Sequence, residues 1–168
     1  MYRSVDFARK ILLYCLIQDP DAKIAHPTLE QVRFFQSVIG RKYPHVASVW
    51  AAADGLKLDF QRTIQNMFFN GWTHGHYINS VLVFTPDGKI RICLINASGT
   101  FHDSSMADYG VYEAMERVYR DTGGKVVVDS AFHLGQRDFI IKSKQQDPLD
   151  IEGLLENRDA TSVRQLSE

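Results

Sequence analysis

Two helical patterns open the chain before any strand pattern appears. Apolar residues recur at helical spacing over residues 4–17, which predicts a helix with Ser4 as its N-cap. A second helix is predicted to follow Thr28, because Thr28 and Gln31 have the spacing of a capping box. An apolar stripe continues this second pattern as far as Gly40, where the helix is expected to end.

The pattern then changes to one typical of strands. Residues 46–58 predict a strand region that contains the pair Asp54-Gly55. That pair is either the turn of a hairpin or a bulge or kink inside one long strand, and the pattern favours neither. A clear hairpin follows, in which residues 81–84 and 90–95 flank a turn at residues 85–89 that contains Pro and Gly.

A helix and a buried strand come next. Apolar residues at helical spacing predict a helix up to Arg120, ended by Gly123-Gly124, with Asp103 in position to be its N-cap. Residues 124–132 contain three consecutive valines, which is typical of a strand buried on both faces. This strand ends at the carboxylate of Asp129, and in α/β folds the end of such a strand is where functional groups are often placed.

The last part of the chain is expected to be partly irregular. A further strand is predicted at residues 138–143, and residues 145–158 have the composition of an irregular insertion. A final helix is predicted to begin at Asp159 or Thr161, with Val163 and Leu166 turned inward, and to reach Glu168.

The overall composition excludes several classes of protein. The 168 residues carry a net charge of −1, so a nucleic acid would have to be bound by a local basic patch. No apolar stretch is long enough to span a membrane, and a signal peptide is not expected. Cys15 and Cys93 are expected to be buried thiols in a reducing compartment, with no disulfide. For His74 and His76, a surface or hydrogen-bonding role is favoured over a metal site.

The order of the elements predicts an α/β fold of the ribonuclease H type. It consists of a mixed sheet flanked by helices, preceded by two N-terminal helices, and we expect a helical segment over residues 1–45 and the sheet domain over 46–168. In such a sheet the first and fourth strands are neighbours, which brings Asp54 close to Asp129. A carboxylate from a late helix would complete an oxygen-only site suited to Mg²⁺ or Mn²⁺. Two such ions can support displacement at a phosphodiester.

Several motifs resemble a known family in the expected order. They are Ala53-Asp54-Gly55, residues 69–72 with His76, the turn at residues 84–88, residues 98–104 and Val128-Asp129-Ser130-Ala131-Phe132. Together they resemble the DDE superfamily endonuclease domain of PIF/Harbinger-type transposases. The resemblance implies that Asp54, Asp129 and Glu168 are catalytic metal ligands. It also implies that Asp103 belongs to the metal site, although a plain helix cap is the competing interpretation for this residue.

The resemblance further implies a metal-dependent nuclease in the nucleus that cleaves DNA and transfers strands. A separate DNA-binding protein and an oligomeric assembly would be compatible with it. The chain is expected to be a copy truncated near Glu168, so a remnant or domesticated protein that only binds DNA or protein is the alternative function. A small-molecule metallohydrolase with an enclosed pocket is a third hypothesis. Basic residues around the acids would favour DNA, and the candidates are Arg62, Lys142, Lys144, Arg158 and Arg164.

Overall fold

The computed structural model describes residues 2–59, 68–71, 73–132, 135, 137–142 and 150–165. Its helices and strands, in chain order, are α1 (Tyr2–Gln18), α2 (Leu29–Lys42), β1 (Val49–Asp59), β2 (Phe69–Asn70), β3 (Gly75–Phe84), β4 (Ile90–Ser98), α3 (Asp103–Ala107), α4 (Val111–Thr122), β5 (Lys125–Val128), β6 (Ile140–Lys142) and α5 (Ile151–Arg164). Short 3₁₀ turns lie at Pro20–Ala22 and Pro44–Val46.

The strands form one mixed sheet. Its order is β2-β3-β1-β5-β6, and β4 also pairs with β3. The pairs β1/β3 and β3/β4 are antiparallel, whereas β1/β5 and β5/β6 are parallel. The first strand of the domain therefore lies beside the parallel strand that follows the crossover helix, which confirms the predicted ribonuclease H-like fold.

The Asp54-Gly55 pair lies inside one long strand. β1 pairs with β3 without interruption from Ala52 to Asp59, so these two residues form neither a hairpin turn nor a bulge against β3. The hairpin predicted farther along the chain is confirmed, because β3 and β4 flank a turn in which Gly88 has a φ of +75°. The long continuous β1 carries Asp54 to the point where β5 ends.

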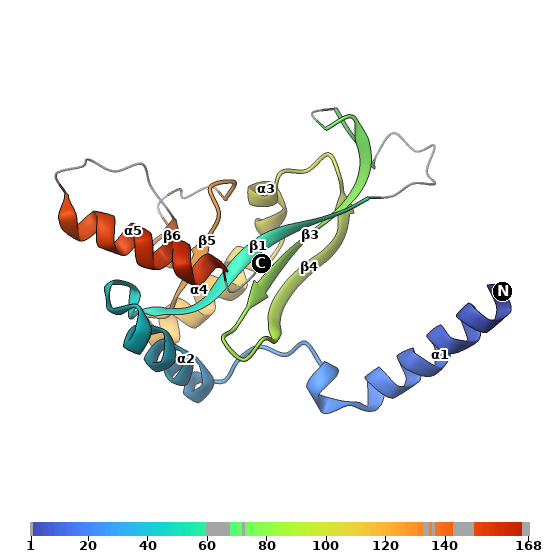
Figure 1. Ribbon diagram of the computed structural model, residues 1–168, viewed down its shortest axis with the longest axis horizontal. Coiled ribbons are helices and arrows are strands. Elements are labelled where there is room, and N and C mark those ends of the chain that lie inside the picture. The colour runs from blue at the N-terminus through green and yellow to red at the C-terminus, as the bar shows by residue number, and fades with distance from the viewer. Residues whose placement is uncertain are drawn as a thin grey trace.

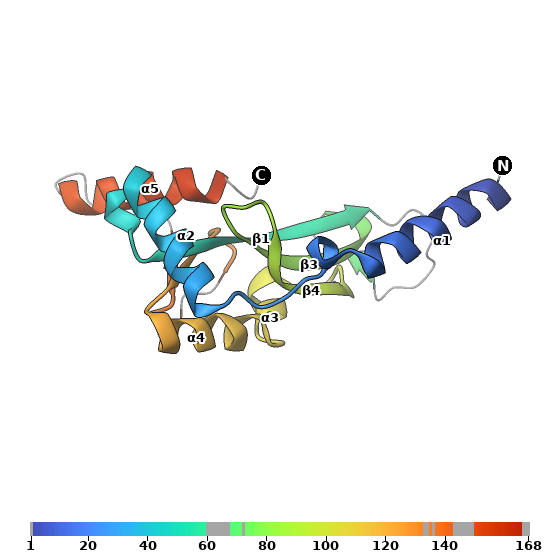
Figure 2. The ribbon, with the colours of Figure 1, turned by 90° about the horizontal axis from the view of Figure 1, so that it is seen from below.

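Helices cover both faces of the sheet. Figure 2 shows α5 on one side of it and α3 and α4 on the other, while α2 runs past the sheet from the level of α5 to that of α4. The larger core lies under α3 and α4 and includes Ala53, Met115 and Val128. The smaller core lies under α5 and includes Val127 and Val163. Consecutive valines of β5 thus enter both cores, which explains why this strand is apolar at every position.

The first helix differs from the sequence-based expectation. α1 begins at Tyr2, so Ser4 lies inside the helix and is not its N-cap. Figure 1 shows α1 extending away from the sheet and its helices. Its apolar side chains are exposed, with Phe7 and Tyr14 exposed by 66% and 69%. Cys15 is also exposed, which corrects the prediction of a buried thiol, and Cys93 is half-buried.

Two further helices also differ from the sequence-based expectation. The predicted Thr28/Gln31 capping box is present, but α2 continues through Gly40 to Lys42. The helix predicted from Asp103 to Arg120 is divided into α3 and α4 at Gly110, which has a φ of +105°. Such a left-handed conformation is open to glycine and interrupts the helical hydrogen bonds.

The last helix begins earlier than predicted. Residues 151–158, expected to be irregular, form the first part of α5, whose N-cap is Asp150 accepting a hydrogen bond from Gly153 N. Asp159 is therefore not a cap. It is buried in the helix, where its carboxylate accepts a hydrogen bond at 2.8 Å from Nδ1 of His45. The predicted inward position of Val163 is confirmed, whereas Leu166 and Ser143 lie outside the described residues.

In the described part of the chain, the helices are too short or too polar to cross a lipid bilayer.

Candidate active site

Strand register brings Asp54 and Asp129 together. In the parallel pair β1/β5, Ala53 lies opposite Val128; Asp54 follows Ala53 within β1, and Asp129 is the first residue after β5. Pairing with β5 ends at this point, because β5 stops at Val128 while β1 continues. The two aspartates are therefore neighbours at the end of the shorter strand. This is the adjacency that the sequence predicts.

Alternation along the strands places both carboxylates on the α5 face. Ala53 and Val128 belong to the core under α3 and α4, so the residues that follow them are directed toward the opposite face. The ion pair of Asp129 agrees with this direction. Its Oδ1 lies 2.7 Å from Nη1 of Arg164, the last residue of α5.

Backbone donors also hold both carboxylates. Oδ1 of Asp54 accepts a hydrogen bond from Gly55 N at 2.8 Å, and Oδ1 of Asp129 accepts one from Ser130 N at 2.5 Å. The Asp129 side chain is 34% exposed and that of Arg164 is 30% exposed. The two acids are thus oriented by the chain, yet they remain accessible from solvent.

Asp103 reaches the same region from the other face. It is the first residue of α3, and His102 occupies the N-cap position, so the helix-cap interpretation of Asp103 is wrong. The Asp103 carboxylate lies over Gly55, where a Cβ atom would come within 2.5 Å of Asp103 Cγ. Gly55 has an ordinary φ, so the close approach of this carboxylate, and no turn, explains the glycine.

The electrostatic environment of Asp103 is unfavourable for its charge. Burial is the main cause that raises the pKa of this carboxyl, and the charges of Asp54 and Asp129 raise it further. The ammonium group of Lys57 acts in the opposite direction. The three aspartates are therefore close enough to affect one another, although they approach from two faces of β1.

Lys57 is a residue that the sequence-based list of basic candidates missed. It follows Gly55 by two positions in β1, so strand alternation directs it to the same face as Asp103. The two-residue spacing between Gly55 and Lys57 predicts a shared face only if β1 is continuous, which the sequence pattern alone did not establish. Three of those candidates are among the described residues, and of these Arg164 alone contacts a site acid, whereas Lys142 donates to Phe132 O and Arg158 pairs with Asp159. Arg62 and Lys144 lie outside the described residues.

The two histidines do not share a strand face. His76 is in β3 and its ring packs against Phe69 with a centroid distance of 5.4 Å. His74 lies before the strand and has a φ of +52°. The period-two arrangement that a metal site on this strand would have needed is therefore not formed.

Comparison with known families agrees with this geometry. The model of the DDE superfamily endonuclease family matches residues 53–168, which is more than half of the chain. The chain belongs to the DDE superfamily endonucleases. The searches of curated proteins and of solved structures gave no match. The family implies a DNA substrate, and its endonucleases generally depend on divalent metal ions.

The described residues of this DDE endonuclease do not form a complete set of metal ligands by themselves. Among them, no three His, Cys, Asp or Glu side chains are grouped closely enough to hold an ion. Glu168, the predicted third ligand, lies outside the described residues. Asp54 and Asp129 nevertheless fit a hard divalent cation, because both offer carboxylate oxygens and Asp129 already binds the cationic Arg164.

Proposed function

We propose that this protein is a metal-dependent DNA endonuclease of the PIF/Harbinger transposase type, which cleaves phosphodiester bonds and transfers DNA strands. The observation that carries the proposal is the register of β1 and β5, in which Asp54 and Asp129 follow a paired Ala53 and Val128. Both acids lie inside the region that matches the endonuclease family. Asp54, Asp129 and Glu168 are the proposed catalytic ligands, and Asp103 is a further acid of the metal site.

The residues of the chain have separate tasks in this proposal. Bound Mg²⁺ or Mn²⁺ would supply activation of an attacking water or DNA 3′-hydroxyl and stabilisation of the leaving oxygen. The N–H groups of Gly55 and Ser130 donate to the carboxylates of Asp54 and Asp129 and so restrict their orientation. Arg164 balances the charge of Asp129 when no other cation is near. The site is thus held in position before the substrate binds.

The wider setting of the activity is also proposed by resemblance to the family. We place the endonuclease domain at residues 46–168, after a helical segment at residues 1–45, and the reaction in the nucleus. A separate DNA-binding protein would then select the target. Val32 and Phe35 of α2 pack into the larger core, so part of the first segment supports the endonuclease domain.

A plasmid-nicking assay tests the proposed function. Supercoiled DNA is incubated with Mg²⁺ or Mn²⁺ and either the unaltered protein, Asp129→Asn or the control Asp121→Asn. Asp121 is an exposed acid near the end of α4, so its substitution removes the same charge away from the site. We expect nicking by the unaltered protein and the control, and loss of at least about a hundredfold in Asp129→Asn.

Two results would contradict the proposal. Nicking that persists in Asp129→Asn would show that this carboxylate does not carry the reaction. A complete absence of metal-dependent nicking by the unaltered protein would instead favour the alternative function, a binding module without catalysis.

A further inference from the structure

A surface groove lies beside Asp103 on the face of the sheet opposite to Arg164. It has a volume of about 520 Å³ and is lined by Lys57, Asn70, Gly71, Thr100, Phe101 and His102. All of these residues except Asn70 are exposed. His102 directly precedes Asp103, and Lys57 follows Gly55 on the same face of β1, so the groove lies close to Asp103, on the face of the sheet opposite to Arg164.

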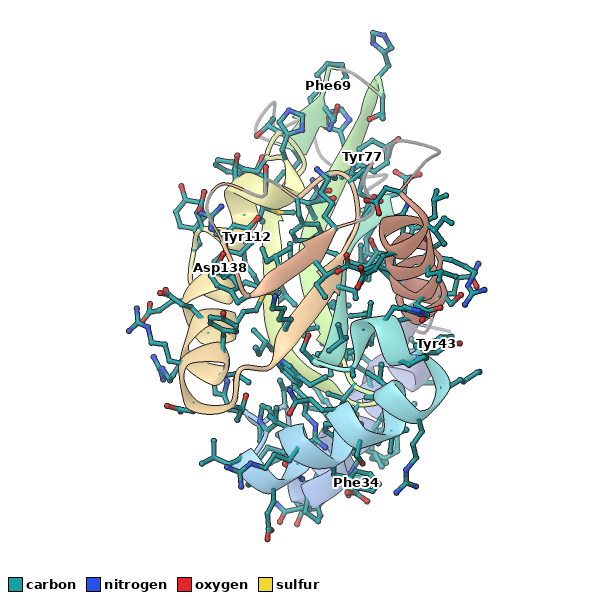
Figure 3. All side chains as sticks on the ribbon, turned by 90° about the vertical axis from the view of Figure 1, so that its left-hand side faces the viewer. Phe34, Tyr43, Phe69, Tyr77, Tyr112 and Asp138 are labelled. Atoms are coloured by element: carbon teal, nitrogen blue, oxygen red, sulfur yellow. The ribbon has the colours of Figure 1, made fainter. Side chains whose placement is uncertain are left out.

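Hydrogen bonds fix the walls of the groove relative to each other. Nδ2 of Asn70 donates to the carbonyl oxygen of Gly99 at 2.7 Å and so ties β2 to the loop after β4. Gly99 has no room for a side chain, because a Cβ atom there would lie 2.5 Å from Tyr77 O. Figure 3 shows Phe69 and Tyr77 at the end of the sheet farthest from Phe34 of α2. The walls of the groove are therefore held in fixed positions at this end of the molecule.

Phe101 provides an aromatic surface in the groove. Phe101 is 42% exposed, yet its backbone is held from inside the protein, because the buried side chain of Asn79 donates to Phe101 O at 3.0 Å. The ring also makes an edge contact with Tyr109 at a centroid distance of 6.2 Å. An exposed ring on a fixed backbone is suited to stacking with a flat ligand.

Lys57 provides positive charge at the same groove. Its ammonium group lies near enough to the Asp103 carboxyl to lower the pKa of that group, against the larger effect of burial. A cation and an aromatic ring that line one groove are the two elements with which proteins bind single-stranded nucleic acid. The cation attracts the phosphate, and the ring stacks on a base.

The size of the groove indicates how much nucleic acid it holds. A volume of about 520 Å³ is within the range of small-ligand sites and is far too small for a duplex about 20 Å wide. In a duplex the bases are stacked on one another, so Phe101 can stack only on a base that is unpaired.

We propose that this groove binds an unpaired nucleotide of a single DNA strand, with the base on Phe101 and a phosphate at Lys57. The inference rests on the proposed endonuclease function and adds to it the part of the substrate that is bound. Gly71 contributes by leaving space, since no atom lies within 4 Å of the position that its Cβ would take.

The test is direct binding of a fluorescein-labelled 15-nucleotide oligo-dT, followed by polarisation in EDTA so that no metal takes part. Phe101→Ala should weaken binding about 5- to 150-fold, which is the effect of one stacked base, and Phe101→Trp should restore it. Lys57→Gln should weaken binding and reduce the slope of log affinity against log salt by about 0.7. Gly71→Leu should weaken binding by filling the groove without removing any contact.

Matched controls are available on other parts of the chain. Phe34→Ala removes an aromatic ring on α2 that is 62% exposed, and Lys23→Gln removes an exposed lysine, so neither should change the affinity. Groove variants that bind oligo-dT as tightly as the unaltered protein would overturn the inference. The inference would also be overturned if the control variants weakened binding as much as the groove variants. It would be overturned too if the groove variants weakened binding of a matched duplex as much as binding of the single strand.

The outcome separates this inference from the proposed function. Asp129→Asn should bind oligo-dT normally in EDTA while losing nicking activity. Weaker binding in the groove variants, together with no metal-dependent nicking by the unaltered protein, would support the proposed nucleotide-binding groove and contradict the proposed nuclease function. Nicking that depends on Asp129, together with unaltered binding in the groove variants, would support the nuclease function and contradict the nucleotide-binding groove.

Discussion

Acids on the two faces of the sheet have opposite electrostatic environments. On the α5 face, Asp129 pairs with Arg164, and the buried Asp159 accepts hydrogen bonds from His45 and Arg158. On the α3 face, burial is the largest effect on the pKa of Asp103, followed by the opposing charge of Lys57 and then by the charges of Asp54 and Asp129, which raise the pKa further. Among the described residues, the charges of Lys57 and His102 lower the pKa of Asp103. Acids with cationic partners stabilise the fold, whereas an acid buried near like charges costs stability, which is typical of a functional site.

The pKa values of these two groups shift in opposite directions. The hydrogen bonds from His45 and Arg158 outweigh burial and hold the pKa of Asp159 below its usual range, while burial raises the pKa of Asp103. A lowered folded-state pKa contributes stability above the unfolded value, and this contribution is lost as the pH falls through the folded value. A raised pKa has the opposite effect: its contribution is present at low pH and is lost as the pH rises.

Replacing Asp159 should have the largest effect on stability. Asp159→Asn removes the charge-assisted hydrogen bond at 2.8 Å that joins α5 to His45, just before β1, and should lower the free energy of unfolding by about 2 kcal/mol at pH 7. Urea unfolding measured from pH 7 down to pH 3 checks this. The difference from the unaltered protein should shrink as the pH falls through the ordinary range of Asp and below. A difference that grows on acidification would contradict the pairing.

Replacing Asp103 should have a smaller effect of the opposite sign. Asp103→Asn keeps the shape of the side chain and removes the buried charge, so it should raise the free energy of unfolding at pH 7 by less than about 1 kcal/mol. The gain should disappear at low pH, where the carboxyl of the unaltered protein is protonated. Destabilisation by Asp103→Asn at pH 7 would show that the charge is favourably paired.

Substitution of Gly55 tests whether the space above it is reserved for Asp103. Gly55→Ala places a methyl group against the Asp103 carboxylate, which can respond by turning toward solvent. The pKa of Asp103, followed by carbon NMR of its carboxyl, should therefore fall toward its usual value. Gly71→Ala is the control, because its Cβ enters open space. An unchanged Asp103 pKa in Gly55→Ala would contradict the close approach.

Replacing Arg164 should have the smallest effect, a modest change in the affinity for Mn²⁺. Its guanidinium competes with any other cation for Asp129, so Arg164→Gln should tighten Mn²⁺ binding about two- to tenfold in calorimetric titration. Arg117→Gln removes an exposed arginine of α4 that pairs with Glu113, and it should leave the affinity unchanged. Weaker Mn²⁺ binding in Arg164→Gln would mean that Arg164 supports the ion site.

Local sequence patterns were sufficient for much of the fold. Three valines in succession identified the strand that ends at Asp129, and the Thr28/Gln31 spacing identified the start of α2. The order of elements was sufficient to predict that β1 and β5 are neighbours. The failures arose where tertiary contacts override local signals: residues 151–158 carry few apolar residues, yet they form a helix that is joined through Asp159 to His45 in the turn before β1.

The candidate site could likewise be predicted only in part from the sequence. The sequence predicted that Asp54 and Asp129 meet, because a parallel register follows from the topology. It did not reveal that Asp103 approaches from the opposite face, since that depends on the alternation of β1 and on the missing side chain of Gly55. Lys57 was missed for a related reason, because a bulge or turn at Gly55 would have changed its direction.

The most direct test of the central claim is Mn²⁺ binding by the unaltered protein, Asp54→Asn, Asp129→Asn and the control Asp121→Asn, followed by electron paramagnetic resonance of the free ion. If the β1/β5 register creates a shared ion site, each of the two site substitutions should weaken binding at least about tenfold, and the control should not. Equal binding by all four proteins would contradict the claim that Asp54 and Asp129 form one metal site.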